Sequence, residues 1–301
     1  MPTGPAPDLP GHAAEGNARP PVLTPRPWWA RIAAGFLLAC LAWLLVGVAA
    51  DSLFGPEYSL ISHAVRAGLT LILVLAGLAA LLRWEGTRAS DYGLVYRKGT
   101  LWALLVGALS YLVPFALAAS VVFGLGLAQL QVTGEPLMVL AQGLVVLALV
   151  VLYEALPEEL IFRGYLFRVL SERLPISLTI VVQAVLFCGA GIIVGAAPTL
   201  DRVLLFFVFS LTLGYLRHVA GTVFVTIGFH AMFQLCAQWA LGEQWATLTV
   251  TDASGWFAIA ALGVVPFALA PVVAGILDRL RRGRTGDGLS APTPDHDPQG
   301  R

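Results

Sequence analysis

The stretch YEALPEELIFRGYLFR, residues 153–168, places three carboxylates and two guanidinium groups directly after an apolar run. Charged groups inside a membrane are costly, so they persist when they are paired, buried among helices or used in chemistry. If the stretch is helical, Glu159 and Arg163 stand at i and i+4 and can pair. Glu158 then points about 100° around the helix axis from Glu159. The stretch therefore predicts two carboxylates with different tasks.

Two neighbouring residues add to this interpretation. Glu154 lies one helical turn before Glu158 and on the same face. Pro157 has no N–H to donate, so it is expected to kink or restart the helix just before the two glutamates.

The composition is that of an integral membrane protein. Of the 301 residues, 58% are hydrophobic and 12% are charged, whereas about 25% are charged in a soluble domain. The formal net charge of zero gives no indication of a nucleic-acid partner, and we expect none. The three cysteines, Cys40, Cys188 and Cys236, fall in apolar segments and indicate small buried side chains rather than disulfides or metal ligands.

Apolar segments predict an all-α, polytopic bundle of about eight transmembrane helices. The fourth is expected to continue as helix through the charged stretch. The expected spans are 32–50, 59–82, 101–127, 137–156, 176–197, 203–216, 219–242 and 256–277.

The domain organisation follows from the same segments. We expect a disordered cytoplasmic tail at 1–27, a membrane domain at 28–278, and a basic, disordered cytoplasmic tail at 279–301.

Basic residues predict the orientation, because Lys and Arg in short loops concentrate on the cytoplasmic side. Of the 18 Lys and Arg, 16 precede the first span or follow the second, fourth, sixth and eighth, whereas the opposite loops carry only Arg202. The sequence therefore predicts a multi-pass protein of a bacterial-type plasma membrane with both termini cytoplasmic. Arg66 and His63 lie near the outer end of the second span and are expected to snorkel to the interface.

Polar residues in three later spans are candidates for a common site. His230 and Gln234 share one helix face at i and i+4. Similar depths in the membrane are expected for Glu158, Phe187 and His230. Counted along each helix, each lies on the order of 20 Å from the cytoplasmic edge. We therefore predict that these residues meet in a cavity open to the cytoplasmic side. The plainer alternative is that a membrane His or Gln only joins two helices by a hydrogen bond.

Two other polar positions have simple readings. Arg217 and His218 lie at the expected cytoplasmic edge of the membrane, and we expect them to anchor the helix at the membrane interface. Gln183 in the fifth span is two turns from Gly191, about 12 Å along the helix axis.

The residues resemble the CPBP family of intramembrane proteases, also called the CAAX amino-terminal protease or bacteriocin-processing family, which includes the type II CAAX prenyl endopeptidases. Residues 158–164 resemble the family's EExxxRG motif, and His230 to Gln234 resembles its HxxxN motif with Gln in place of Asn. The FxxxH motif is matched at Phe187, with Gly191 in the place of the histidine. The segment 91–94 is similar to an amphipathic segment that precedes the family core, expected here at 137–242.

The resemblance implies roles for these residues. Glu158 would be the general base, Glu159 the partner of Arg163, and His230 with Gln234 the oxyanion donors, supported by Phe187 and Glu154. A divalent metal such as zinc is implied as a cofactor whose identity stays open. Its ligands would be Glu158, Glu159 and His230, and that set is incomplete because position 191 is Gly.

The predicted function is an intramembrane endopeptidase, a hydrolase that uses glutamate-activated water. Its expected partners are membrane lipid and a hydrophobic or lipidated peptide substrate. The alternatives are a weakly active or inactive relative that serves as a membrane scaffold or immunity protein, and a small transporter. In a protease that lacks the histidine, Glu154 would share a proton with Glu158, and Gly191→His would leave or raise activity.

Overall fold

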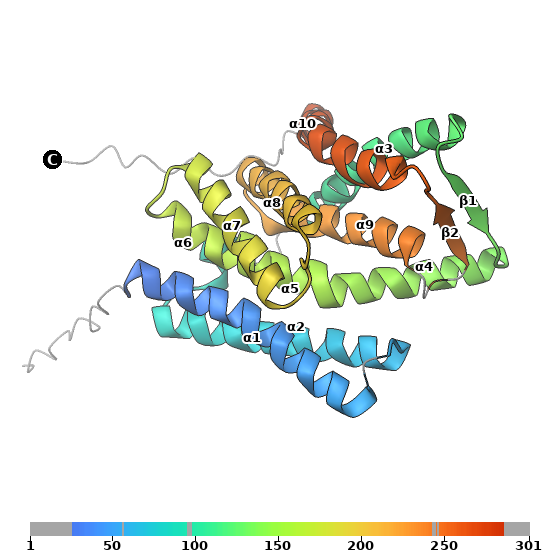
Figure 1. The fold of residues 1–301 in the computed structure, drawn as a ribbon. Helices are drawn as coiled ribbons and strands as arrows, with labels where there is room; N and C mark the ends of the chain where they lie inside the picture. The colour runs from blue at the N-terminus through green and yellow to red at the C-terminus, as the bar shows by residue number, and fades with distance from the viewer. Residues whose placement is uncertain (1–25, 56, 95–97, 243–244, 246, 286–301) are drawn as a thin grey trace, which may run out of the picture.

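The computed structural model describes residues 26–55, 57–94, 98–242, 245 and 247–285. The two predicted tails lie outside the described residues except at their inner ends, where the last helix continues to Thr285. Eight helical segments in the described part of the chain are long and apolar enough to cross a membrane. The predicted polytopic helical bundle is therefore confirmed (Figure 1).

The elements follow one another in an almost wholly helical order. The first half contains α1 (Trp28–Phe54), α2 (Leu60–Glu85), the 3₁₀-helix η1 (Ala89–Tyr92), α3 (Thr100–Gly124), β1 (Gln129–Val132) and α4 (Pro136–Val150). The central segment contains the π-helix η2 (Val151–Ala155), α5 (Leu156–Glu159), the π-helix η3 (Leu160–Leu166) and α6 (Phe167–Ser171). The last part contains α7 (Ile176–Ile193), α8 (Leu200–Ala220), α9 (Val223–Leu241), β2 (Leu248–Thr251), the π-helix η4 (Phe257–Val264) and α10 (Val265–Thr285).

The elements from α4 to α6 form one continuous helix, Pro136–Ser171, with two widened turns. The first of these, η2, ends two residues before Pro157. Proline lacks the N–H that an α-helix needs and its ring collides with the carbonyl four residues earlier, so a π-turn accommodates it without breaking the helix. The same order recurs where η4 precedes Pro266.

Helix α9 is held against α3 by two glycines. A Cβ at Gly107 would lie 1.9 Å from the Val225 carbonyl oxygen, and one at Gly228 would lie 2.1 Å from the Leu104 carbonyl oxygen. Small residues allow such a close backbone approach between membrane helices. Because Gly228 precedes His230 by two residues, this contact also fixes where the histidine lies.

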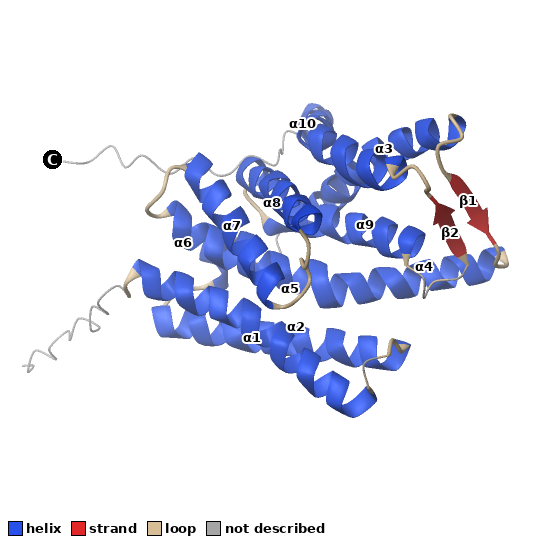
Figure 2. Ribbon diagram, viewed as in Figure 1, coloured by secondary structure: helices blue, strands red, loops and turns tan. Residues whose placement is uncertain are grey.

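The loops expected at 128–136 and 243–255 contain a short sheet that the sequence did not reveal. Strands β1 and β2 pair antiparallel, with Gln129 opposite Thr251 and Val132 opposite Leu248. The sheet lies at the end of the bundle opposite the start of α1 and the connection between α6 and α7 (Figure 2). We call these the sheet end and the α1 end.

Candidate active site

The expected ion pair lies fully buried between η3 and the surrounding helices. Arg163 Nη1 donates to Glu159 Oε1 at 2.8 Å, and both side chains are fully buried. Arg163 Nη2 donates to Ser210 Oγ at 2.8 Å, and Gln183 Nε2 donates to the same oxygen at 2.9 Å. The two buried charges are thus paired with each other. Glu159 Oε2 and Arg163 Nε, by contrast, are buried with no hydrogen-bond partner among the described residues.

His230 lies between the two adjacent glutamates. Its Nδ1 is 2.9 Å from Glu159 Oε1, and its Nε2 is 3.9 Å from Glu158 Oε2. The ring of Phe209 packs edge-on against the imidazole, with ring centroids 4.8 Å apart. The structure therefore brings Glu158, Glu159 and His230 together, although they come from two helices about 70 residues apart in the chain.

The tautomer of His230 follows from its partner. Glu159 also accepts from the Arg163 guanidinium, and an ionised carboxylate can only accept hydrogen bonds. His230 Nδ1 therefore carries the hydrogen, and a neutral ring presents the Nε2 lone pair toward Glu158.

Glu154 is not free beside Glu158 but has a partner on α9. Gln238 Nε2 donates to Glu154 Oε1 at 2.8 Å, and the other carboxylate oxygen, Oε2, is buried without a partner among the described residues. Gln238 was missed by sequence reasoning, although it follows His230 and Gln234 at the same four-residue spacing. Gln234 lies half-buried between them on α9, and its role as an oxyanion donor stays a prediction.

Phe187 contacts the Arg163 side of the site. The Arg163 guanidinium carbon lies 4.6 Å from the centroid of the Phe187 ring, an arrangement in which the ring face attracts the cation. The Phe187 ring also stacks on Phe206, with centroids 5.3 Å apart. Phe187 therefore supports the ion pair.

Phe206 occupies the space beside Gly191. A Cβ at Gly191 would lie 2.8 and 2.9 Å from two ring carbons of Phe206, and 3.4 Å from Ala197 Cβ. The position that the family motif gives to histidine is thus backed by an aromatic ring in this chain. A histidine at 191 would require that ring to move.

Arg217 is not an interface anchor. It is 9% exposed, and its Nε donates to the Arg163 carbonyl oxygen at 2.9 Å. Its Nη2 donates to the Tyr92 carbonyl oxygen at 3.4 Å. Sequence reasoning placed Arg217 by its proximity to the end of a span, whereas its side chain turns inward; the neighbouring His218 is exposed.

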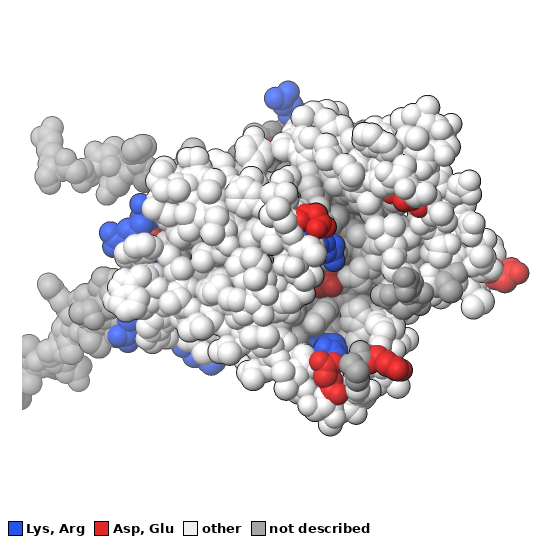
Figure 3. Space-filling model, in the orientation of Figure 1, with Lys and Arg blue, Asp and Glu red and all other residues white. Residues whose placement is uncertain are grey.

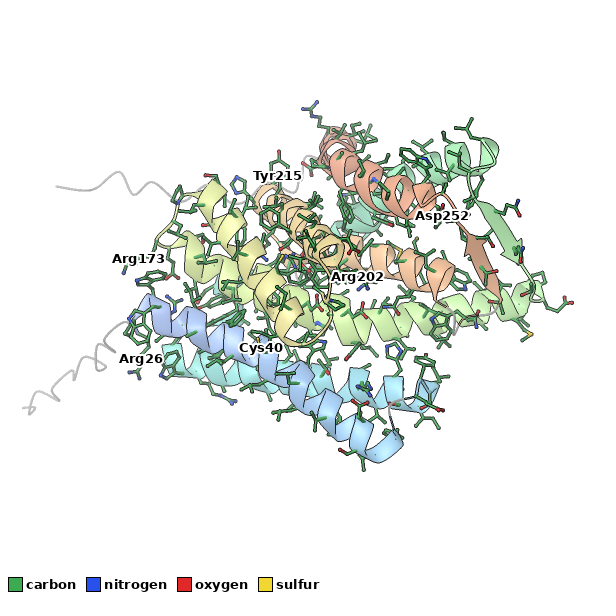
Figure 4. The ribbon with its side chains drawn as sticks, in the orientation of Figure 1. Arg26, Cys40, Arg173, Arg202, Tyr215 and Asp252 are labelled. Carbon is green, nitrogen blue, oxygen red and sulfur yellow. The ribbon has the colours of Figure 1, made fainter. Side chains whose placement is uncertain are left out.

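Burial differs along the part of the long helix that carries Glu158. Ile161, Arg163 and Leu166, toward the α1 end, are fully buried, whereas Glu158 is 20% exposed and Glu154 is half-buried. The face in Figure 3 is hollowed between the bundle's two halves, and Figure 4 places Arg202 there, between Arg173 at the α1 end and Asp252 at the sheet end. Glu158 and Glu154 are thus more accessible than the residues toward the α1 end. The expectation that the cavity opens to the cytoplasmic side stays a prediction.

The donor set does not fit a zinc site. A structural or catalytic zinc takes at least three protein ligands. Glu159 Oε1 and His230 Nδ1 bond each other, so Glu158 and His230 Nε2 are the donors that face the opening. No group of three or more His, Cys, Asp or Glu side chains within the described ranges could hold a metal ion. We therefore derive no step through a metal.

The fold and the site together define a polytopic helical membrane protein with a buried histidine set between two glutamates. Residues 140–236 match the family described as type II CAAX prenyl endopeptidase Rce1-like. This segment is therefore similar to that family, and the match confirms the resemblance to the CPBP proteases. Members of the family are intramembrane proteases. Searches of curated proteins and of solved structures gave no match.

Proposed function

We propose that this chain is an intramembrane endopeptidase that cleaves a membrane-anchored, hydrophobic or lipidated peptide with water activated at Glu158. The observation that carries the proposal is the 3.9 Å separation of Glu158 Oε2 and His230 Nε2, in a ring whose Nδ1 is held by Glu159. A gap of this size between two polar atoms is one that a single water molecule bridges.

The proposed chemistry begins with that water. Glu158 accepts one proton while the water oxygen attacks the scissile carbonyl carbon, and His230 Nε2 holds the second hydrogen as an acceptor. Glu159 keeps the ring in the required tautomer and orientation, as a carboxylate does for histidine in other hydrolases.

The tetrahedral intermediate then carries a negative oxygen. The Gln234 amide is proposed as a donor to this oxyanion, and the proton left on the attacking oxygen passes to His230 Nε2 as the carbonyl re-forms. The proton held on Glu158 passes to the leaving nitrogen as the C–N bond breaks. The products are a carboxylate and an amine, so the reaction is balanced with water as the only co-reactant.

Glu154 has a second place in the proposal. It lies one turn from Glu158 on the same face, and its buried Oε2 has no partner among the described side chains. Two close carboxylates do not both ionise readily, so Glu154 and Glu158 would share a proton. This sharing would replace part of the water activation that the motif histidine, Gly191 here, is expected to give in other family members.

A membrane scaffold or immunity protein is the second candidate. The observation that favours it is the ring of Phe206, which fills the space beside Gly191. Without the motif histidine, the site lacks one of the groups that would activate water, which favours a binding role over catalysis.

Cleavage of a reporter panel tests the proposal. The purified full chain in liposomes is given membrane-anchored peptides, half of them prenylated, and products are read by mass spectrometry. We expect cleavage by the wild type and a loss of kcat of about 10²-fold or more in Glu158→Gln.

The matched control is Glu135→Gln, which removes an exposed carboxylate from the start of the same long helix and should cleave like the wild type. If the wild type cleaves no peptide while Glu158→Gln retains the cellular role, the scaffold function stands instead.

A further inference from the structure

We propose that Arg217 is a positioning residue, whose guanidinium clamps the junction of η3 and α6 and thereby sets the helical phase of Glu158 and Glu159. The consequence for catalysis rests on the proposed function, whereas the clamp itself does not. Arg217 lies near the C-terminal end of α8 and touches neither glutamate in the described contacts.

The Arg163 carbonyl is the group that the junction leaves without a helical donor. In a π-helix each carbonyl bonds the N–H five residues on, and in an α-helix four residues on, so the change of register passes over one carbonyl. The Phe167 N–H bonds the carbonyls of Phe162 and Gly164. The carbonyl between them, that of Arg163, receives the Arg217 Nε at 2.9 Å.

This bond therefore stabilises the widened turn relative to a regular helix. If η3 relaxed to a regular α-helix, the preceding residues would rotate relative to α6 by about one residue step, roughly 100°. Glu159 and Arg163 could not then both keep their buried partners. The charged donor also satisfies a buried carbonyl that would otherwise cost free energy.

The other end of the clamp is anchored to the end of η1. Arg217 Nη2 reaches the Tyr92 carbonyl, and a Cβ on Gly93 would lie 3.0 Å from the same nitrogen. Gly93 has φ +70°, a conformation that glycine adopts without strain. The Tyr92 hydroxyl donates to Glu85 Oε2 at 2.6 Å. Burial, together with this bond, raises the pKa of the Tyr92 phenol, which stays a donor.

A third contact joins the same segment to η3. A Cβ on Gly164 would lie 2.5 Å from Leu94 Cδ2, so the segment packs directly onto the π-turn. The Arg217 guanidinium also lies 5.5 Å from the centroid of the Phe167 ring, the first residue of α6. Arg217 thus links the segment at 91–94, the π-turn and α6 at one point.

Lysine cannot take this place. Its single ammonium lacks the fixed fork that lets Arg217 bond two carbonyls in different directions at once. Arg217→Lys keeps the charge and much of the side-chain length, so it tests the two-carbonyl geometry while retaining the cation.

Amide hydrogen exchange tests the clamp without any assay of activity. In the full chain, Arg217→Lys should raise exchange of the amides in 160–167 by at least about tenfold, which is what one hydrogen bond from a charged donor is worth. Exchange in α7 should stay unchanged. His218→Gln, an exposed neighbour on the same turn, is the matched control and should leave both segments as in the wild type.

Kinetics on a cleaved reporter test the consequence. Arg217→Lys should lower kcat on the order of 10²-fold, the effect of a small misplacement of catalytic groups, with KM within about twofold. Methylguanidine added to Arg217→Ala should restore part of kcat, by a larger factor than any gain in folded fraction that its effect on the unfolding temperature accounts for, a result that a merely structural role would not give.

Three outcomes would decide against parts of the account. Unchanged exchange in 160–167 overturns the clamp. Raised exchange with an unchanged kcat overturns the positioning role. Raised exchange in a chain whose wild type cleaves nothing leaves the clamp standing and removes the proposed function.

Discussion

At the scale of single residues, the two adjacent glutamates differ in what surrounds them. Glu159 is fully buried and bonds both Arg163 and His230 through Oε1. Glu158 is 20% exposed and faces His230 Nε2 across a gap. The division into a paired and a free carboxylate was predictable from the i, i+4 spacing alone.

What could not be predicted at this scale are the contacts made by other helices. Nothing in the sequence indicates that Phe206 fills the space beside Gly191, because a side chain's neighbours across a bundle depend on helix rotation and tilt. Gln238 was foreseeable from its spacing to His230 and Gln234. Arg217 was misjudged because a basic residue at a span's end more often snorkels to the surface.

Position 191 gives a prediction that replaces the earlier expectation for Gly191→His. Because its Cβ would lie under 3 Å from the Phe206 ring, the single change should lower stability by about 1–3 kcal/mol through overpacking. Adding Phe206→Ala should restore the unfolding temperature in part and raise kcat above that of the wild type. Thermal unfolding in detergent and reporter cleavage measure the two effects.

The double variant carries its own control. Phe206→Ala alone removes the stacking on Phe187 and should lower stability without raising kcat. A double variant that is no faster than Phe206→Ala would show that space at 191 does not limit the reaction.

At the scale of elements, the long helix from α4 to α6 carries the site because it is not uniform. Its charged stretch and its helical continuation were predictable, and so was a disturbance at Pro157. The form of that disturbance was not, because proline can kink, break or widen a helix, and the outcome depends on what packs around it. The second π-turn, η3, begins three residues after Pro157, whereas a proline disturbs the turn that precedes it, so η3 was not predictable from that proline.

The π-turn at η2 gives a prediction for Pro157→Ala. Alanine restores the N–H and removes the ring, so a regular α-turn becomes accessible. Rotation of Glu154 relative to Glu158 should then break its bond to Gln238 and lower kcat on the order of tenfold or more. Stability should not fall by more than about 1 kcal/mol, because alanine is the better helix former.

The measurement combines kinetics with an amide-exchange comparison of 151–157. Pro271→Ala, a proline inside α10, is the control and should leave kcat unchanged. An unaltered kcat in Pro157→Ala would show that the widened turn does not position the carboxylates.

At the scale of the whole molecule, the eight spans were predictable because a bilayer imposes their length and apolarity. The short sheet was not, since four-residue strands carry little pattern.

The orientation of the bundle gives a further prediction. From the distribution of Lys and Arg we propose that the α1 end is cytoplasmic, so Arg173→Cys should be shielded from an impermeant maleimide in intact cells and Glu135→Cys should be labelled. Both positions are exposed. The opposite labelling pattern would show that the sheet end, not the α1 end, is cytoplasmic.

The central claim is that Glu158 and His230 act on the same water molecule, and a double-mutant cycle tests it most directly. Reporter cleavage is measured by mass spectrometry for the wild type, Glu158→Gln, His230→Gln and the double variant. Groups that act as a unit are strongly non-additive. We predict that the double variant is about as slow as the slower single variant. If the loss of kcat in the double variant instead equals the product of the losses in the two single variants, the two residues act independently and the shared water is contradicted.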